Sequence, residues 1–203
     1  LTVNVGNIIG AIENTPGTYL ETRTAGVGVD GAGFQSHGLN TGGGSFQWDA
    51  YSSAGVGRNG LEVLYSAGGF TGHISYSQQN GGTIPGSANG TERTAVMGSY
   101  AFGDWRASLG YQDSNVVGED KLVFTVQGDI GQFGVRFAYG NNQDAGGVGV
   151  DIDKYGIYGN MDIGAASNIL AFVTSEDAPG MVSDGTGYGI HYSYDLGGGA
   201  SFE

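Results

Sequence analysis

The sequence contains no cysteine, only 3 prolines and only 7 lysine and arginine residues in a chain of 203. The absence of cysteine excludes a disulfide framework, a thiolate metal site and a catalytic thiol. The 20 acidic residues outnumber the basic ones and give a net charge of −13. Because phosphate binding needs clustered cations, this balance excludes a nucleic-acid-binding protein. No run approaches the roughly 18 consecutive apolar residues of a membrane helix.

Glycine is abundant instead, with 42 residues, and it is accompanied by 12 tyrosines and 9 phenylalanines. The glycines do not recur at every third position, so the chain is not collagen-like. Glycine inside a helix costs about 1 kcal/mol relative to alanine, and it interrupts every candidate helical window. Composition alone leaves two classes open, a disordered glycine-rich chain and an all-β protein, and periodicity must separate them.

The periodicity is that of β-strands. Leu109 and Tyr111, for example, alternate with Ser108 and Gln112, so that large apolar and small polar residues take opposite faces. The same alternation occurs in four other segments, residues 70–77, 122–127, 133–140 and 186–195. Short glycine-containing turns alternate with longer polar loops along the chain. This arrangement predicts an all-β, antiparallel up-and-down meander of hairpins.

The composition of the two faces favours a transmembrane β-barrel over a soluble sandwich. A soluble core needs bulky residues, whereas here one face carries mainly glycine, serine, threonine, histidine and arginine. In a membrane barrel the apolar face meets lipid and the small polar face lines water. Strands of about ten residues also fit a tilted bilayer crossing. Aromatic residues near strand ends resemble an interfacial girdle, namely Tyr100, Phe102, Trp105, Phe133 and Tyr194.

One long segment interrupts the meander. We expect a first strand over residues 1–12 and then no strand until Gly60. Loops of this length are usually functional or disordered. In a barrel, residues 13–59 are the natural candidate for a loop that folds into the lumen and narrows it, within a single domain of residues 1–203.

Charged residues on the polar faces are candidates for the wall of such a pore. Arg136 lies in the middle of its predicted strand, at the height of a constriction, and Arg106 lies near a short turn. His73, His191 and Glu62 complete the predicted wall. Basic wall residues opposite an acidic inward loop would create a transverse field that orients dipolar solutes. In a soluble protein the same residues would be ordinary surface charges.

A metal site is a second possibility. Asp144, Asp151 and Asp153 share one long loop, and flexible loops rich in carboxylates suit Ca²⁺. The alternative is a solvated acidic surface.

Two segments, residues 26–31 and 55–60, match the pattern G-x-G-x-x-G. They do not predict nucleotide binding, because a dinucleotide fingerprint must be followed by a helix, and the residues after the 55–60 match have a strand pattern.

Three stretches resemble hairpins of the general diffusion porins of alphaproteobacteria: residues 64–70, 100–111 and 188–201. The resemblance implies a 16-stranded barrel that is trimeric and resides in the bacterial outer membrane. It also implies that residues 13–59 correspond to the third loop of that family, which sets the narrowest point of the pore and often binds Ca²⁺ together with the outer rim. The acidic candidates in this loop are Glu13, Glu21, Asp30 and Asp49.

The resemblance therefore implies a passive outer-membrane porin that selects small hydrophilic solutes and ions by size and charge. No enzymatic activity is expected and no cofactor is required, with calcium as a possible ligand. Outer-membrane lipid, including lipopolysaccharide, is the expected surrounding. Only about 11 strands can be counted, so we expect further strands before Leu1 and after Glu203. A glycine-rich surface adhesin and a barrel lipid hydrolase remain as alternatives, and a substrate-specific channel is not separated from a general one.

Overall fold

The computed structural model describes residues 1–8, 10–12, 14–18, 59–79, 91–115, 117, 120–143, 149, 151–177 and 185–202. All regular structure in this part of the chain is β-strand. The strands are β1 (Thr2–Gly6), β2 (Asn59–Ala67), β3 (Phe70–Gln79), β4 (Thr91–Phe102), β5 (Trp105–Ser114), β6 (Lys121–Ile130), β7 (Phe133–Asn142), β8 (Ile152–Ile163), β9 (Ser167–Asp177), β10 (Gly185–Gly197) and β11 (Ala200–Phe202).

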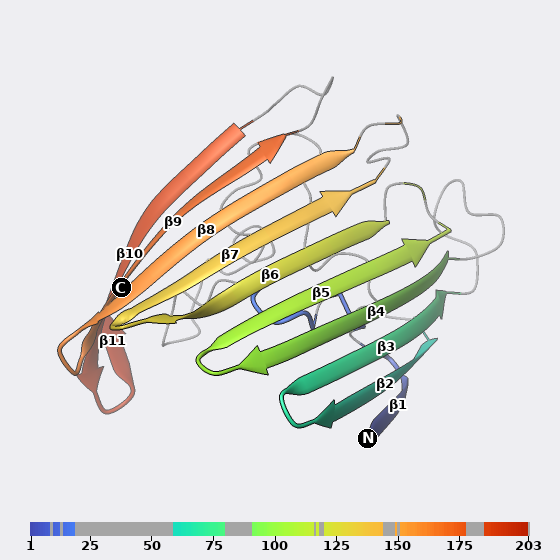
Figure 1. The fold of residues 1–203 in the computed structure, drawn as a ribbon, viewed down its shortest axis with the longest axis horizontal. Coiled ribbons are helices and arrows are strands. Elements are labelled where there is room, and N and C mark those ends of the chain that lie inside the picture. The colour runs from blue at the N-terminus through green and yellow to red at the C-terminus, as the bar shows by residue number, and fades with distance from the viewer. Residues whose placement is uncertain are drawn as a thin grey trace.

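The strands form one sheet in which each pairs with its neighbour in the chain, in the order β1 to β11. All pairs are antiparallel, as β4 and β5 illustrate. Figure 1 shows the long, tilted strands lying side by side in a curved sheet, with the tight turns at one end. At the opposite end, longer stretches of sequence separate consecutive strands, such as β3 from β4 and β7 from β8. The predicted antiparallel up-and-down meander is thereby confirmed. We call the two ends of the sheet the short-turn end and the long-loop end.

Glycine makes the tight turns possible. The turns after β2, β4, β6 and β8 contain Gly68, Gly103, Gly131 and Gly164, with φ between 58° and 68°. The turns after β2, β4 and β6 have two residues and the turn after β8 has three. Short hairpin connections of this kind need positive φ, because this backbone geometry matches the right-handed twist of the strands. Residues with a Cβ atom rarely adopt that conformation.

The prediction of a first strand over residues 1–12 was wrong in its extent, because β1 ends at Gly6. Gly6 has a φ of +119°, where the chain leaves the sheet. Beyond it, Ile8, Ala11 and Ile12 are all buried rather than alternating between faces. A clustered apolar run of this kind packs against a surface, whereas a strand with one lipid-facing side alternates.

The two faces of the sheet have opposite environments. Large apolar side chains such as Ile74, Leu109 and Ile157 are between 52% and 64% exposed. Polar side chains of the other face, such as His73 and Thr125, are at most 1% exposed. We call these the outer and the inner face. A water-soluble sheet buries its apolar face, so the observed polarity is that of a barrel wall in lipid. No helix among the described residues is long and apolar enough to span a membrane.

Candidate functional site

The inner face is organised in rows that run from strand to strand. Gln127 of β6 pairs with Arg106 of β5 on one side and with Arg136 of β7 on the other. Arg136 in turn pairs with Tyr158 of β8. Because residues directly opposite each other in a sheet share a face, the two arginines belong to one row. This row lies toward the short-turn end, so Arg136 and Arg106 lie at the same height in the sheet, with Gln127 between them, rather than at two separate heights.

The chain that follows β1 crosses this inner face. We call residues 10–12 and 14–18 the inward segment. The backbone N–H of Ala11 donates to Ser75 Oγ on β3 at 2.9 Å. Farther along, the hydroxyl of Thr125 on β6 donates to the carbonyl oxygen of Pro16 at 2.5 Å. The inward segment therefore runs obliquely over several strands, from β3 to β6, and this course is visible as the blue trace against the sheet in Figure 1.

Short internal bonds hold the inward segment in a compact turn. Asn14 Nδ2 donates to the carbonyl oxygen of Gly10, and the hydroxyl of Thr15 donates to that of Ala11. The backbone N–H of Thr15 also donates to the carbonyl oxygen of Ile12. These bonds satisfy backbone groups that lie away from the sheet's own ladder, which buried polar groups require.

Glycines allow the inward segment to lie flat on the wall. A Cβ atom on Gly110 of β5 would lie 2.7 Å from the Thr15 hydroxyl and 3.1 Å from the Ile12 side chain. Gly17 has a φ of +86°, and a Cβ atom there would lie 3.0 Å from the Gln127 side-chain oxygen. Both positions therefore need the small residue, one on the wall and one on the segment. The inward segment reaches Gln127, which lies between the two arginines.

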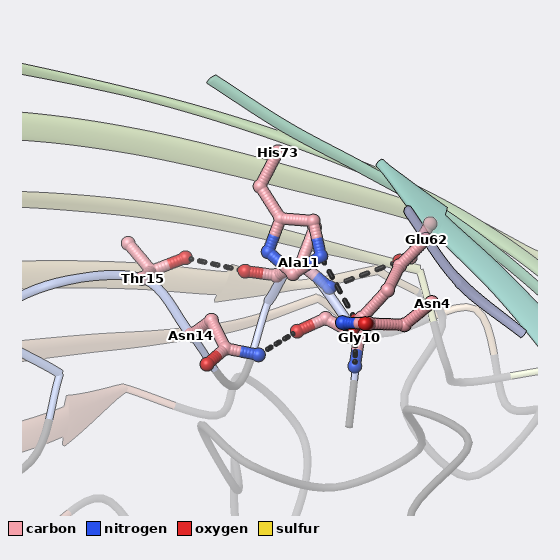
Figure 2. A network of polar contacts seen from close by, with 8 residues as sticks. Asn4, Gly10, Ala11, Asn14, Thr15, Glu62 and His73 are labelled. Atoms are coloured by element: carbon pink, nitrogen blue, oxygen red, sulfur yellow. Dashed lines mark hydrogen bonds and ion pairs between the residues drawn. The ribbon is translucent and has the colours of Figure 1, made fainter. Parts of the chain in front are cut away.

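Glu62 of β2 fixes the beginning of the inward segment (Figure 2). One carboxylate oxygen accepts a hydrogen bond from Asn4 Nδ2 at 2.8 Å. The other accepts from the backbone N–H of Gly10 at 3.3 Å and lies 3.0 Å from His73 Nε2. Glu62 and His73 are 8% and 1% exposed, so this cluster is removed from water. Hydrogen bonds to a buried carboxylate are stronger than those between neutral groups.

A cavity of about 690 Å³ lies beside this covered wall, toward the short-turn end. Arg106, Arg136 and His191 line it together with residues of both polar and acidic character, including Gln127, Asn160, Asn168, Asp104, Asp129 and Asp162. Asp162 accepts a hydrogen bond from Asn168 Nδ2 at 2.8 Å. The cavity is thus an open part of the inner face with charges of both signs.

A further set of charged residues is buried on the inner face toward the long-loop end. Lys154 Nζ of β8 lies 4.0 Å from Glu176 Oε2 of β9, and both side chains are 1% exposed. Arg93 and Lys121 are also buried at the starts of β4 and β6. Charged side chains are rarely buried without partners, so this end of the inner face is a closely packed polar region.

The five predicted wall residues all lie on the inner face but in two different settings. Arg106, Arg136 and His191 meet in the cavity, whereas Glu62 and His73 lie with the inward segment. The predicted acidic loop residues Glu13, Glu21, Asp30 and Asp49 lie outside the described residues. Part of the predicted loop of residues 13–59, namely residues 14–18, is described, and it lies on the inner face.

The possible calcium site remains a prediction. Asp144 lies outside the described residues, and Asp151 precedes β8. One oxygen of Asp153 accepts hydrogen bonds from the Tyr139 hydroxyl at 2.7 Å and from Asn141 Nδ2 at 2.9 Å. Within the residues that the structure describes, no group of three or more histidine or acidic side chains is arranged to hold a metal ion.

Several residues of the inner site were not predicted, among them Asn4, Ser75, Thr125 and Gln127. The period-two pattern does place Thr125 and Gln127 on the polar face of their strand. It contains no signal, however, that Thr125 contacts Pro16, which lies 109 positions earlier in the chain. Such long-range contacts follow from the course of the inward segment, which strand periodicity does not describe.

Comparisons with known proteins agree with this geometry. A family model described as Gram-negative porin matches residues 1–203. A porin structure refined at 1.8 Å resolution is similar to 75% of the chain, with 26% identity and a TM-score of 0.59. A variant of the porin of Rhodopseudomonas blastica is similar over 96%, with 21% identity and a TM-score of 0.65. The matches cover 56% and 63% of those two chains, respectively. No curated protein matches the chain significantly.

Proposed function

The chain belongs to the Gram-negative porin family, and we propose that the protein forms a passive, water-filled channel for small hydrophilic solutes and ions. It is an integral protein of the outer membrane. The family and the fold indicate a channel protein, and neither favours a surface adhesin or a lipid hydrolase. Since the chain spans less than two thirds of the length of the two porins compared, this activity is proposed for the complete protein.

The observation that carries the proposal is the polarity of the sheet. Apolar side chains cover the outer face, while the inner face carries mainly hydroxyl, amide and charged side chains, with some buried apolar ones such as Met97 and Phe172 among them. In lipid this arrangement exposes apolar groups to hydrocarbon and polar groups to a lumen. Within the described residues, β1 to β11 pair in chain order, so that each inner strand has its backbone groups satisfied by two neighbours, as spanning segments need.

We propose that the inward segment contributes to the constriction of the channel. This proposal is supported by the hydrogen bonds that attach the segment to the wall at two places, to Glu62 and Ser75 at one end and to Thr125 at the other. Such attachment occupies part of the inner face and leaves the cavity with Arg106 and Arg136 beside it. Arginine side chains on a lumen wall would favour anions by electrostatic attraction.

The partners of the complete protein are further proposals. We propose a homotrimer embedded in outer-membrane lipid, with lipopolysaccharide around its outer rim. The support is the exposed apolar outer face, where residues such as Val173 and Ile190 need a lipid or protein neighbour. Chemical crosslinking of the folded protein in detergent, followed by mass measurement, tests the trimer.

The channel itself is tested in planar lipid bilayers. The full-length protein, refolded in detergent and added to one side, is expected to produce stepwise increases of current in KCl. Folded and heated samples should migrate differently in a gel, because a closed barrel resists detergent unfolding. Folded protein that yields no conductance steps and no permeation in liposomes would contradict the proposed function.

A further inference from the structure

Tyr158 lies at the edge of the cavity on the inner face. The residues of β8 that line the cavity are Tyr158, Asn160 and Asp162, whereas Gly156, two positions before Tyr158, is not among them. Since β8 runs from the long-loop end to the short-turn end, the cavity begins at Tyr158 on this strand and extends toward the short turns. Tyr158 therefore marks the edge of the cavity on the side of the long-loop end.

The ring of Tyr158 is turned away from this cavity. Gly156 and Tyr158 share the inner face, because residues two positions apart in a strand point to the same side of the sheet. A Cβ atom on Gly156 would overlap the Tyr158 hydroxyl and would lie 2.6 Å from the ring carbon Cζ. The ring thus lies along β8 over Gly156, toward the long-loop end, and the space on its other side is left to the cavity.

The neighbouring strands restrict where the ring can go. On β9, Phe172 pairs with Tyr158, and the two ring centroids lie 6.3 Å apart. Phe172 lies flat in its turn, because a Cβ atom on its partner Gly189 would lie 2.6 Å from the Phe172 ring. On the other side, Arg136 of β7 pairs with Tyr158. Side chains in strands lean along the strand direction, so the ring can point back over Gly156 or forward into the cavity.

The next cavity residue on β8 also lies close against the wall. Asn160 pairs with Gly134 of β7, and a Cβ atom on Gly134 would overlap Asn160 Oδ1 and would lie 3.0 Å from Cγ. Gly134 and Gly156 therefore have the same effect, because each leaves room for a larger side chain to lie along the sheet instead of projecting from it.

We propose that Tyr158 is a size-determining residue of the channel and that Gly156, by leaving room for the ring, keeps the cavity at its full width. A benzene ring fits a cavity of about 150 Å³, so a ring that pointed forward would occupy about one fifth of the 690 Å³ present. This inference rests on the proposed channel function and assigns particular residues to its selection by size. Pore diameter is one of the properties by which channels select solutes.

The test is the substitution Gly156→Ala in the full-length protein. The new methyl group should force the ring forward, so the single-channel conductance in KCl should fall by about one fifth, the share of the cavity that the ring would occupy. In liposome swelling, the rate with raffinose should fall more than the rate with the smaller sugar arabinose. Both sugars are uncharged, so the ratio of their rates depends on the width of the channel and not on its charge.

Two further variants serve as controls. Gly159→Ala is the matched control, because Gly159 lies on the outer face of the same strand and a Cβ atom there would have its nearest neighbour 3.9 Å away. In a Tyr158→Ala background, the further change Gly156→Ala should leave the conductance and the ratio of the sugar rates unchanged, because no ring remains to be displaced.

The possible results separate the role of Tyr158 from the channel function. A loss in Gly156→Ala that is absent from Gly159→Ala and from the Tyr158→Ala background supports the inference. Unchanged values in Gly156→Ala overturn it and leave the channel function intact. An equal loss in the Tyr158→Ala background overturns it as well, because the effect would not then depend on the ring. A Gly156→Ala protein that does not fold also overturns it, since the ring would have no place in the cavity. No conductance from the folded, unmodified protein contradicts the channel function and the inference with it.

Discussion

Two neighbouring regions of one inner face differ in how their polar groups are used. Under the inward segment, Glu62 has its carboxylate oxygens bonded to Asn4, Gly10 and His73 and is nearly inaccessible. In the cavity, Arg106 and Asp129 are exposed and face solvent. Identical strand geometry thus supports a fixed, structural wall and an open, solute-facing wall. The difference arises from what covers the wall. Mutations in the region under the inward segment should therefore change the stability of the protein, and mutations in the cavity should change permeation.

The largest effect is expected for Glu62→Ala. It removes the acceptor of the buried Gly10 N–H and the buried partner of the His73 ring, as well as the acceptor of the more exposed Asn4 amide. Breaking a buried charged network costs about 3 kcal/mol of folding free energy. The inward segment would lose its first attachment, so single-channel current should also become noisier. Urea unfolding of the full-length protein in detergent, together with bilayer recordings, measures both effects.

Glu62→Gln is the matched control for this change. The amide keeps one acceptor oxygen and the shape of the side chain, so a smaller loss of about 1 kcal/mol is expected. Equal unfolding midpoints for Glu62→Ala and the unmodified protein would show that the cluster does not stabilise the wall, and would remove the distinction between the two regions.

A second effect is expected when a methyl group is added to the wall beneath the inward segment. In Gly110→Ala the new methyl group meets the Thr15 hydroxyl and the Ile12 side chain, and overpacking of this kind costs about 1–3 kcal/mol. The displaced inward segment should change the single-channel conductance as well. Gly98→Ala on β4 is the control, because its nearest neighbour, the Phe70 ring, would be 3.8 Å away. If both alanine variants unfold at the same urea concentration, the inward segment is not packed on β5.

Much of the fold was accessible from the sequence because strand alternation is a local property. The apolar Leu109 and the polar Ser108 indicate the two faces of β5 by their side chains alone. The glycines indicate the tight turns. The extent of β1 was not predictable in this way, because Ile8 and Ile12 lie beyond the strand and pack against Gly60 and Gly110, which are far along the chain. The shared height of Arg136 and Arg106 was also not predicted, because it depends on the register of three strands rather than on the position of each residue within its own strand.

A smaller effect is expected at the second attachment of the inward segment. Thr125→Val keeps the shape of the side chain but removes the hydroxyl that donates to the carbonyl oxygen of Pro16. The loss should be about 1 kcal/mol, the net value of one hydrogen bond, measured by urea unfolding. Thr125→Ser retains the donor and should lose less. A Thr125→Ser variant as unstable as Thr125→Val would mean that the methyl group, not the hydrogen bond, holds the segment.

The smallest change in free energy is expected in the open region, where Arg136→Gln should leave the unfolding midpoint nearly unchanged. Arg136 lines the cavity and is half-buried, so its charge also acts on passing ions. In a KCl gradient the reversal potential should shift toward cations by about a twofold change in permeability ratio, or ~0.4 kcal/mol. The shift should shrink in concentrated salt, because the screening length falls from about 10 Å at 0.1 M to about 3 Å at 1 M. A large loss of stability without a shift in selectivity would instead assign Arg136 to the structural wall, and the boundary between the two regions would then lie nearer the short-turn end.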